Sequence, residues 1–276
     1  MSDSTFTKLE LANWQSVVEM AFSSPVAQWD QETITIVEAS ISALNDGVLR
    51  IMQPSNEGWK HFPWLQKAIL CYFKLHGNTT YFHSGLPYKD KVPSRFSDEA
   101  SLNAWNGRIV PPAHARYGSY IGNHCVIMPS FINIGAYVDD FTMIDTWSTV
   151  GAGAQIGKNV HISGGAGIGG ILEPPQASPT IIEDACFIGA RSEIAEGVVV
   201  KQGAVIAMGT FISQSTRIYD RTTKKTFYGV VPENAVVVPG NIPSSDGSYS
   251  LNAAIIVKYA DAKTRAKIGI NQLLRD

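Results

Sequence analysis

An aliphatic side chain recurs every six residues through the second half of this chain, and this spacing limits the folds open to it. A helical face requires a period of 3.6 and a half-exposed strand a period of 2, so neither reproduces a strict six. A six-residue repeat is typical of a parallel β-helix, in which three hexads complete one triangular turn. The two phase-locked runs are Val126, Ile132, Val138, Ile144, Val150, Ile156, Ile162 and Ile168, then Ile182, Ile188, Ile194, Val200, Ile206, Ile212 and Ile218.

Small side chains follow the aliphatic residues at fixed offsets. Glycine often comes directly after, as in Val150-Gly151 and Ile188-Gly189. We expect the aliphatic side chains to stack inside the prism and the small residues to occupy its corners. The small or medium residues four positions on are Ala136, Thr142, Ser148, Ala154, Ala166, Ser192, Ala204 and Thr210.

The flanking residues lack the hexad and predict two further domains. Residues 1–110 contain three stretches with helical apolar spacing, so we expect an α-rich N-terminal domain that ends near Pro111-Pro112. The β-helix is expected over 111–245, with an extruded loop at 169–180 that either serves the binding face or is a surface insertion without function. Residues 246–276 predict a strand from Ser250 to Tyr259 and a helix that caps the coil.

Charge and cysteine content argue against several kinds of partner. The net charge of -2 over 276 residues leaves no basic excess for nucleic-acid phosphates. No apolar run approaches the roughly 18 residues of a membrane span, and no signal-peptide pattern is visible at the N-terminus. Cys71, Cys125 and Cys186 lack metal-ligand spacing. We expect reduced, buried thiols in a cytoplasmic protein without nucleic-acid or membrane partners.

Long motifs in the chain resemble one acyltransferase family, the tetrahydrodipicolinate N-succinyltransferases. The resemblance implies a left-handed parallel β-helix, a homotrimer with active sites between neighbouring prisms, and succinyl transfer from succinyl-CoA to tetrahydrodipicolinate in the lysine and diaminopimelate pathway. The similarity runs from about Val48 to the C-terminus. The motifs are NIGAYVDDFTMIDTWSTVGAGAQIGKNVHISGGAGIGGILEPPQA, IIEDACFIGARSEIAEGVVV, QSTRIYDR and DAKTRAKIGINQLLR.

The resemblance also implies roles for individual residues. Asp145 and Glu193 match the family's catalytic and substrate-orienting carboxylates, with turn capping as the alternative. If the insertion replaces part of one hexad, these carboxylates lie two turns apart on one face, about 9–10 Å along the axis. Arg108 matches a substrate-binding arginine, with a domain-boundary salt bridge as the alternative. Arg217 is a second candidate, because a dicarboxylate substrate needs arginines.

Coenzyme A requires room for an extended arm and cations for its phosphates. Gly167, Gly169, Ala207 and Gly209 carry small or no side chains, so the arm could lie against the coil there. The candidates for the phosphates, with a solvated basic face as the alternative, are Lys258, Lys263, Arg265 and Lys267.

Histidine is the rival to the carboxylates as catalytic base. His161 lies directly before an inward isoleucine, and several hexapeptide acyltransferases use histidine. His114 and His124 are expected at the surface or stacked between rungs.

A γ-carbonic anhydrase-like site needs three histidines at matched spacing, which is missing, so we expect no metal. A sugar-nucleotide acetyltransferase would need a nucleotide-binding domain, and a non-catalytic solenoid would have no use for the two carboxylates.

The acyl donor is the point where the sequence departs from the family. The family usually has Ser and Gly where this chain has Ala207 and Ser213, and a second Lys where it has Tyr259. A succinyl group ends in a carboxylate that needs a cation or several donors out of water, whereas an acetyl group does not. We expect succinyl-CoA, with acetyl-CoA as the alternative. The departures also fit a tabtoxin-type paralogue in a secondary pathway.

Overall fold

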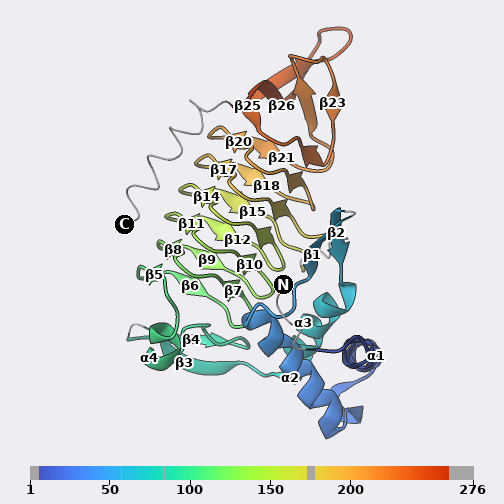
Figure 1. Cartoon of the computed structure of the whole chain (residues 1–276), viewed down its shortest axis with the longest axis vertical. Coiled ribbons are helices and arrows are strands. Elements are labelled where there is room, and N and C mark those ends of the chain that lie inside the picture. Colours follow the sequence, from blue (N-terminus) through green and yellow to red (C-terminus); the bar gives the residue numbers. More distant parts are fainter. Residues whose placement is uncertain (1–5, 57, 84, 173–177, 261–276) are drawn as a thin grey trace.

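The computed structural model describes residues 6–56, 58–83, 85–172 and 178–260. Short strands stack in a column along the long axis of the molecule (Figure 1). The N-terminal helices lie at one end of this column, and the long strands β25 (Ala235–Pro243) and β26 (Ser250–Tyr259) lie at the other. None of the helices in these ranges combines the length and hydropathy that a membrane span requires.

Each main helix of the N-terminal part begins at a residue suited to a helix start. The Thr7 side chain accepts a hydrogen bond from the Glu10 amide, while the Glu10 carboxylate accepts one from the Thr7 amide. Asp30 caps the second helix, and Pro63 begins the third. The elements are α1 (Lys8–Ser23), η1 (Val26–Gln28), α2 (Gln31–Asn45), β1 (Met52–Ser55), β2 (Gly58–His61), α3 (Pro63–Leu75), β3 (Thr79–His83), β4 (Leu86–Asp90) and α4 (Glu99–Asn103).

Three parallel sheets form the coil, and the chain visits them in the order I, II, III. Sheet I runs in spatial order through β5 (Arg108–Ile109), β8 (Val126–Ile127), β11 (Met143–Ile144), β14 (His161–Ile162), β17 (Phe187–Ile188) and β20 (Val205–Ile206), then β25, β26, β22 (Arg217–Asp220) and β23 (Thr226–Phe227). Sheet II contains β6 (His114–Ala115), β9 (Phe131–Ile132), β12 (Thr149–Val150), β15 (Gly167–Ile168), β18 (Glu193–Ile194) and β21 (Phe211–Ile212). Sheet III contains β7 (Tyr120–Ile121), β10 (Tyr137–Val138), β13 (Gln155–Ile156), β16 (Ile181–Ile182), β19 (Val199–Val200) and β24 (Val230–Val231).

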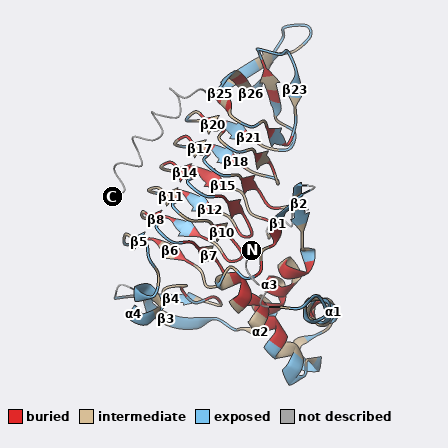
Figure 2. Ribbon diagram, viewed as in Figure 1, coloured by how far each residue is buried: buried red, intermediate tan, exposed pale blue. Residues whose placement is uncertain are grey.

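The hexad repeat accounts for the core of the coil. Its aliphatic residues from Ile132 to Ile218 are at most 2% exposed. All the small residues predicted at corners are also buried, which confirms that they turn inward where one sheet meets the next. Buried residues follow the interior of the column in Figure 2. This arrangement of stacked sheets fits a left-handed parallel β-helix.

The predicted phase of the repeat is wrong at its two ends by one residue. Ile127, not Val126, is the partner of inward Ile144. After Ile218 the repeat is expected to return at Val230, but Val230 is 37% exposed and Val231 is fully buried. The chain leaves the repeat through β22 and β23 before β24, and this excursion shifts the phase, so a strict count of six misplaces the inward residue.

Residues of the predicted extruded loop reach the core of the N-terminal part. Ile171 is fully buried in one apolar cluster with Ile51, Leu65 and Ile69. The Gln66 amide of α3 donates a hydrogen bond of 2.9 Å to the Ile171 carbonyl. The beginning of the insertion is therefore anchored to α3 by apolar packing and one polar contact.

The C-terminal strand prediction is confirmed, because β26 spans Ser250–Tyr259. It pairs antiparallel with β25 and parallel with β22. The predicted C-terminal helix, including Lys263, Arg265 and Lys267, lies outside the described residues.

All three cysteines are free and buried, as expected. Burial raises the pKa of the Cys71 thiol to about 11 and that of the Cys186 thiol to about 12. Because the thiolate is the reactive form, neither of these two thiols is suited to nucleophilic chemistry near neutral pH.

Replacing one inward isoleucine should cost the coil much of its stability. Ile162→Ala opens a cavity between the isoleucines above and below it, so we expect the free energy of unfolding to fall by about 2–5 kcal/mol. Denaturant titration would measure this loss. Leu9→Ala is the control, because Leu9 is 81% exposed on α1. Equal stability of both variants would contradict the role of the isoleucine column.

Candidate functional site

Asp145 begins the corner that leads from sheet I to sheet II, and its carboxylate is held on one side only. Its Oδ1 accepts hydrogen bonds from the Thr146 amide at 2.6 Å and the Thr146 hydroxyl at 3.2 Å. The Ser148 hydroxyl donates to the Asp145 carbonyl. These contacts fix the carboxylate orientation and leave Oδ2 directed toward the neighbouring rung.

His161, the rival base, lies next to Asp145. It occupies the next strand of sheet I, where it pairs with Met143. Its Nε2 is 3.8 Å from the Asp145 Oδ2. The ring is buried and packs against Phe187 with centroids 5.1 Å apart. The sequence presented the two residues as alternatives, and the structure brings them together because eighteen residues make one full turn.

Glu193 opens β18 in sheet II and lies over a glycine of the strand below. It pairs with Gly167, and a Cβ added to Gly167 would lie 2.0 Å from the Glu193 Oε2. The side chain therefore needs a residue without a Cβ beneath it. Glu193 is exposed, but the part of its side chain over Gly167 loses contact with water, and this desolvation raises the pKa of the Glu193 carboxyl.

The prediction that Asp145 and Glu193 share one face is wrong. Asp145 follows β11 of sheet I, whereas Glu193 lies within β18 of sheet II. The insertion adds residues between β15 and β16 without replacing a hexad, so the two carboxylates are separated by two turns and one side of the prism.

The two carboxylates nevertheless border the same edge of the prism. The turn that precedes Glu193 stacks on the turn after Asp145 through hydrogen bonds from the Gly165 amide to the Thr146 carbonyl and from the Arg191 amide to the Gly164 carbonyl. Two strand spacings separate these turns, about 10 Å along the axis. We call this edge the I/II corner: residues 128–130, 145–148, 163–166, 189–192 and 207–210.

The two candidate substrate arginines lie at opposite ends of sheet I. Arg108 is exposed on β5, two strands from β11 and Asp145. Within the described residues it forms no ion pair, so the domain-boundary salt bridge receives no support there. Arg217 is exposed on β22, beyond β25 and β26. A single chain therefore brings Arg108, but not Arg217, toward Asp145.

The small residues proposed to contact coenzyme A lie in different surroundings, so the reason for a small side chain differs between them. Gly209 has φ +70° in the I/II corner, and no side chain or backbone atom of the other described residues beyond its two neighbours lies within 4 Å of an added Cβ. Ala207 precedes it, and its carbonyl accepts a hydrogen bond from the Ser192 hydroxyl. An added Cβ on Gly169 would meet the Ala195 Cα at 2.8 Å, so packing explains that glycine. Lys258 is exposed on β26.

One cation at this edge had not been selected from the sequence. Arg191 supplies the only lysine or arginine of the I/II corner. It has φ +59°, and its side chain extends over Gly165, where an added Cβ would lie 2.7 Å from the Arg191 Cδ. Its position two residues before Glu193 is the signal that could have identified it.

His114 and His124 stack on aromatic rings of adjacent turns, which confirms their expected place between rungs. His114 stacks on Phe131 and His124 on Phe141, with interplanar angles of 13° and 14°. In the part of the chain that the structure describes, no three His, Cys, Asp or Glu side chains gather as a metal site would require.

Large apolar side chains are exposed around the I/II corner. Trp147 and Met208 lie in the corner and are 65% and 69% exposed, while Phe211, next to Glu193 in sheet II, is 55% exposed. Exposed apolar groups gathered along one edge mark a surface for contact with another molecule.

Comparisons with known proteins identify the family of the chain. Residues 13–75 match the family model "Tetrahydrodipicolinate N-succinyltransferase N-terminal", and residues 179–214 match "Hexapeptide repeat of succinyl-transferase". Because the first match lies largely before Val48, the resemblance extends farther toward the N-terminus than the motifs indicated.

Similar curated proteins span nearly the whole chain, and those described here are named 2,3,4,5-tetrahydropyridine-2,6-dicarboxylate N-succinyltransferase. The protein from Sodalis glossinidius is 53% identical over 265 residues, or 95% of this chain and 97% of its own length. The protein from Acinetobacter baylyi is 53% identical over 271 residues, or 96% and 99% of the two chains. The protein from Idiomarina loihiensis is 56% identical over 237 residues, or 85% and 86%. The chain belongs to the tetrahydrodipicolinate N-succinyltransferase family of hexapeptide-repeat acyltransferases.

Proposed function

We propose that the protein transfers the succinyl group of succinyl-CoA to the nitrogen of tetrahydrodipicolinate. The amine of the hydrated acceptor attacks the thioester carbonyl, the C–N bond forms, the C–S bond breaks, and coenzyme A leaves as the thiol. A base must accept the proton that the nitrogen loses. The observation that carries the proposal is the Glu193 carboxylate held over Gly167 beside the I/II corner.

Glu193 is the proposed general base. A base is most effective when its pKa is close to the working pH. Burial moves the pKa of Glu193 in that direction, and its carboxylate has no hydrogen-bond donor among the described residues that would oppose the shift. The small residues Ala207 and Gly209 leave room on the next turn for the arm of coenzyme A.

Asp145 and Arg108 are proposed to hold the acceptor. The Arg108 guanidinium supplies a charge-assisted contact for one carboxylate of the dicarboxylate. Asp145 orients the attacking nitrogen through Oδ2, the oxygen that Thr146 leaves free. His161 then supports Asp145 from the adjacent strand and is not itself the base. Arg217 lies far from this group within one chain, so any contact with the same acceptor would come from another subunit.

Both carboxylates should be required for turnover. We expect Asp145→Asn and Glu193→Gln to keep the fold and to lower kcat by about 10²–10⁴, as for a positioned acid-base group. Release of the coenzyme A thiol measures the rate. Because the pKa of Glu193 is raised, the acid limb of kcat/KM should lie at a higher pH than the titration of an ordinary glutamate.

His161→Ala is the matched control for those two variants. Its loss should be much milder, because the ring contacts Asp145 without accepting the proton of the substrate. Near-normal kcat in both carboxylate variants would remove them from the mechanism. A collapse of activity in His161→Ala alone would make the histidine the base.

A homotrimer with sites between neighbouring prisms is the proposed assembly. The exposed side chains of Trp147, Met208 and Phe211 beside the carboxylates support a subunit contact at that edge. The three free, buried cysteines are compatible with the proposed cytoplasmic location.

Sedimentation should therefore give a mass about three times 30.0 kDa. Placing a charge in the proposed contact, as in Trp147→Glu, should shift the protein toward smaller species and reduce activity in parallel, because a buried unpaired charge is unfavourable. A wild-type monomer with full activity would contradict a site shared between subunits.

Succinyl-CoA is the proposed donor, and two observations bear on it. Arg191 places a cation in the I/II corner, where the succinyl carboxylate would need one. Tyr259, which replaces a lysine of the family, donates a hydrogen bond of 2.9 Å to the Asp220 carboxylate at the end of the coil. Thr222 and Thr223 also donate to Asp220, and these bonds hold its pKa well below the usual range. The contact with Asp220 therefore accounts for a tyrosine at position 259, and no role in an acyl pocket is needed to explain it.

Comparing kcat/KM for succinyl-CoA and acetyl-CoA tests the donor. We expect the wild type to prefer succinyl-CoA. Arg191→Ala should lower kcat/KM for succinyl-CoA more than for acetyl-CoA, because only the first donor loses an ion pair. Tyr259→Lys, the control, should leave the ratio unchanged. A wild-type preference for acetyl-CoA above about tenfold, roughly 1.4 kcal/mol, would overturn the assignment.

A further inference from the structure

A cavity lies on a different edge of the prism from the I/II corner. Its volume is about 390 Å³, within the range of small-molecule sites. One wall is the β1–β2 hairpin with Arg50 before it, and the other is the corner where sheet III leads into sheet I. Asp139 and Asp184 lie in that corner, before β11 and β17, whereas Asp145 follows β11.

Arg50 lines this cavity, and only part of its guanidinium is hydrogen-bonded. Its Cζ lies 3.5 Å from the centroid of the Tyr137 ring and 5.7 Å from that of Trp59. Its Nε donates a hydrogen bond of 3.0 Å to the Gln155 side chain. In the described residues no acceptor pairs with its two terminal nitrogens, and burial lowers its pKa. A planar pair of donors held between rings matches the two oxygens of a carboxylate.

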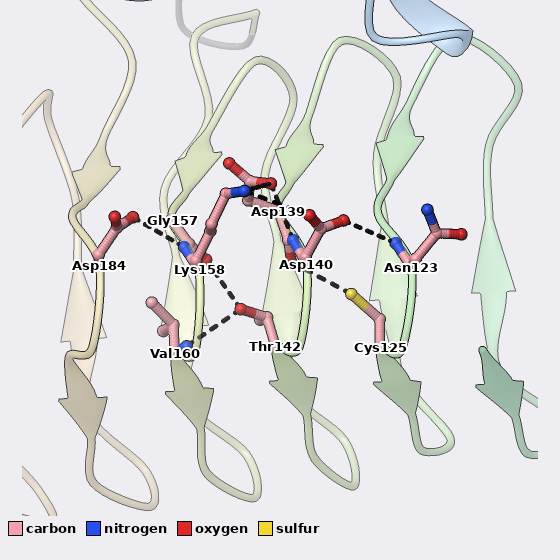
Figure 3. A network of polar contacts seen from close by, with 9 residues as sticks. All are labelled: Asn123, Cys125, Asp139, Asp140, Thr142, Gly157, Lys158, Val160 and Asp184. Carbon is pink, nitrogen blue, oxygen red and sulfur yellow. Dashed lines mark hydrogen bonds and ion pairs between the residues drawn. The ribbon is translucent and has the colours of Figure 1, made fainter. Parts of the chain in front are cut away.

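The other wall is acidic, and the positive charges of Lys158 and Arg50 neutralise it only in part. Figure 3 shows Asp139 and Asp140 on one turn and Asp184 two turns away, and the Lys158 side chain extends from the turn between them toward Asp139 and Asp140. The Lys158 Nζ is 3.2 Å from the Asp140 Oδ2 but 3.9 Å from the Asp139 Oδ1. Asp184 accepts a hydrogen bond from the Lys158 amide. Burial raises the pKa of Asp139, so a ligand cation beside it would relieve an unfavourable charge.

Glu183 frames the cavity but is already satisfied. It accepts hydrogen bonds from the Trp59 indole at 2.9 Å, the Lys201 ammonium at 2.8 Å and the Gln202 amide at 3.0 Å. These contacts tie the hairpin to the coil and hold the Trp59 ring at the side of the cavity. The groups left for a ligand are therefore Arg50 on one wall and the two aspartates on the other.

We propose that this cavity binds a free α-amino acid as its zwitterion. The ligand carboxylate pairs with Arg50, the ligand ammonium pairs with Asp139, and the aliphatic side chain lies along Trp59. A simple anion would meet Arg50 but also face the aspartates, and a simple cation would face Arg50 and Lys158. Only a ligand with both charges complements both walls.

Calorimetric titration of the full-length protein with L-norleucine tests the site. We expect saturable binding of one norleucine per chain. Hexanoate and hexylamine, which each keep one of the two charges, should bind at least about tenfold more weakly, since each loses one charge pair. Asp139→Asn and Arg50→Lys should each weaken norleucine binding at least about tenfold. Glu32→Gln is the control for removal of an acidic charge, because Glu32 is exposed on α2, and it should bind normally.

The Asp145→Asn variant distinguishes this cavity from the proposed acceptor site. It should bind norleucine as the wild type does, and loss of binding would show that the amino acid occupies the acceptor site instead. Thermal melts identify a variant that fails to fold. If Arg50→Lys does not fold, the isosteric Asp139→Asn variant still tests the site. No saturable norleucine binding, equal binding of hexanoate, or unchanged binding in folded Asp139→Asn would overturn the proposal.

Discussion

The vertical pairing of short parallel strands is the constraint on which the rest of the structure depends. Each two-residue strand hydrogen-bonds to the strand one turn away, as Ile144 pairs with Ile162 and Ile162 with Ile188. This register places every inward aliphatic residue over another, and the burial of that column stabilises the coil. Because the register also holds outside the prism, outward side chains one turn apart, such as Met143 and His161 or Gly167 and Glu193, become neighbours.

The corners give this regular scaffold its candidate functional site. Trp147 and Arg191 adopt φ near +59° at equivalent positions of the I/II corner, a conformation that ordinarily favours glycine. Pairing on both sides of each corner holds the backbone in that conformation. A large apolar side chain and a cation thereby stand on the same edge as the two carboxylates.

Two carboxyl groups of this protein differ in the direction of their pKa shifts because they have different hydrogen-bond donors around them. Asp220 accepts hydrogen bonds from Thr222, Thr223 and Tyr259, and these lower its pKa. The Glu193 carboxyl is partly desolvated over Gly167, the described residues give it no such donors, and its pKa is raised. The first arrangement secures the end of the coil, whereas the second suits a group that must accept a proton.

The sequence alone determined the coil, its inward residues from Ile132 to Ile218 and the strand from Ser250 to Tyr259, because a period of six and a run of β-formers are local patterns that the fold preserves. It also indicated the family, and it named Asp145 and Glu193 as candidate site residues. Only the tertiary structure decided which faces Asp145 and Glu193 occupy. Their faces depend on whether the insertion after Ile168 replaces a hexad or is added between two hexads. The tertiary structure likewise decided the contact of His161 with Asp145 and the meeting of Arg50 with Asp139, because stacking and docking of the N-terminal part join residues that no local pattern relates.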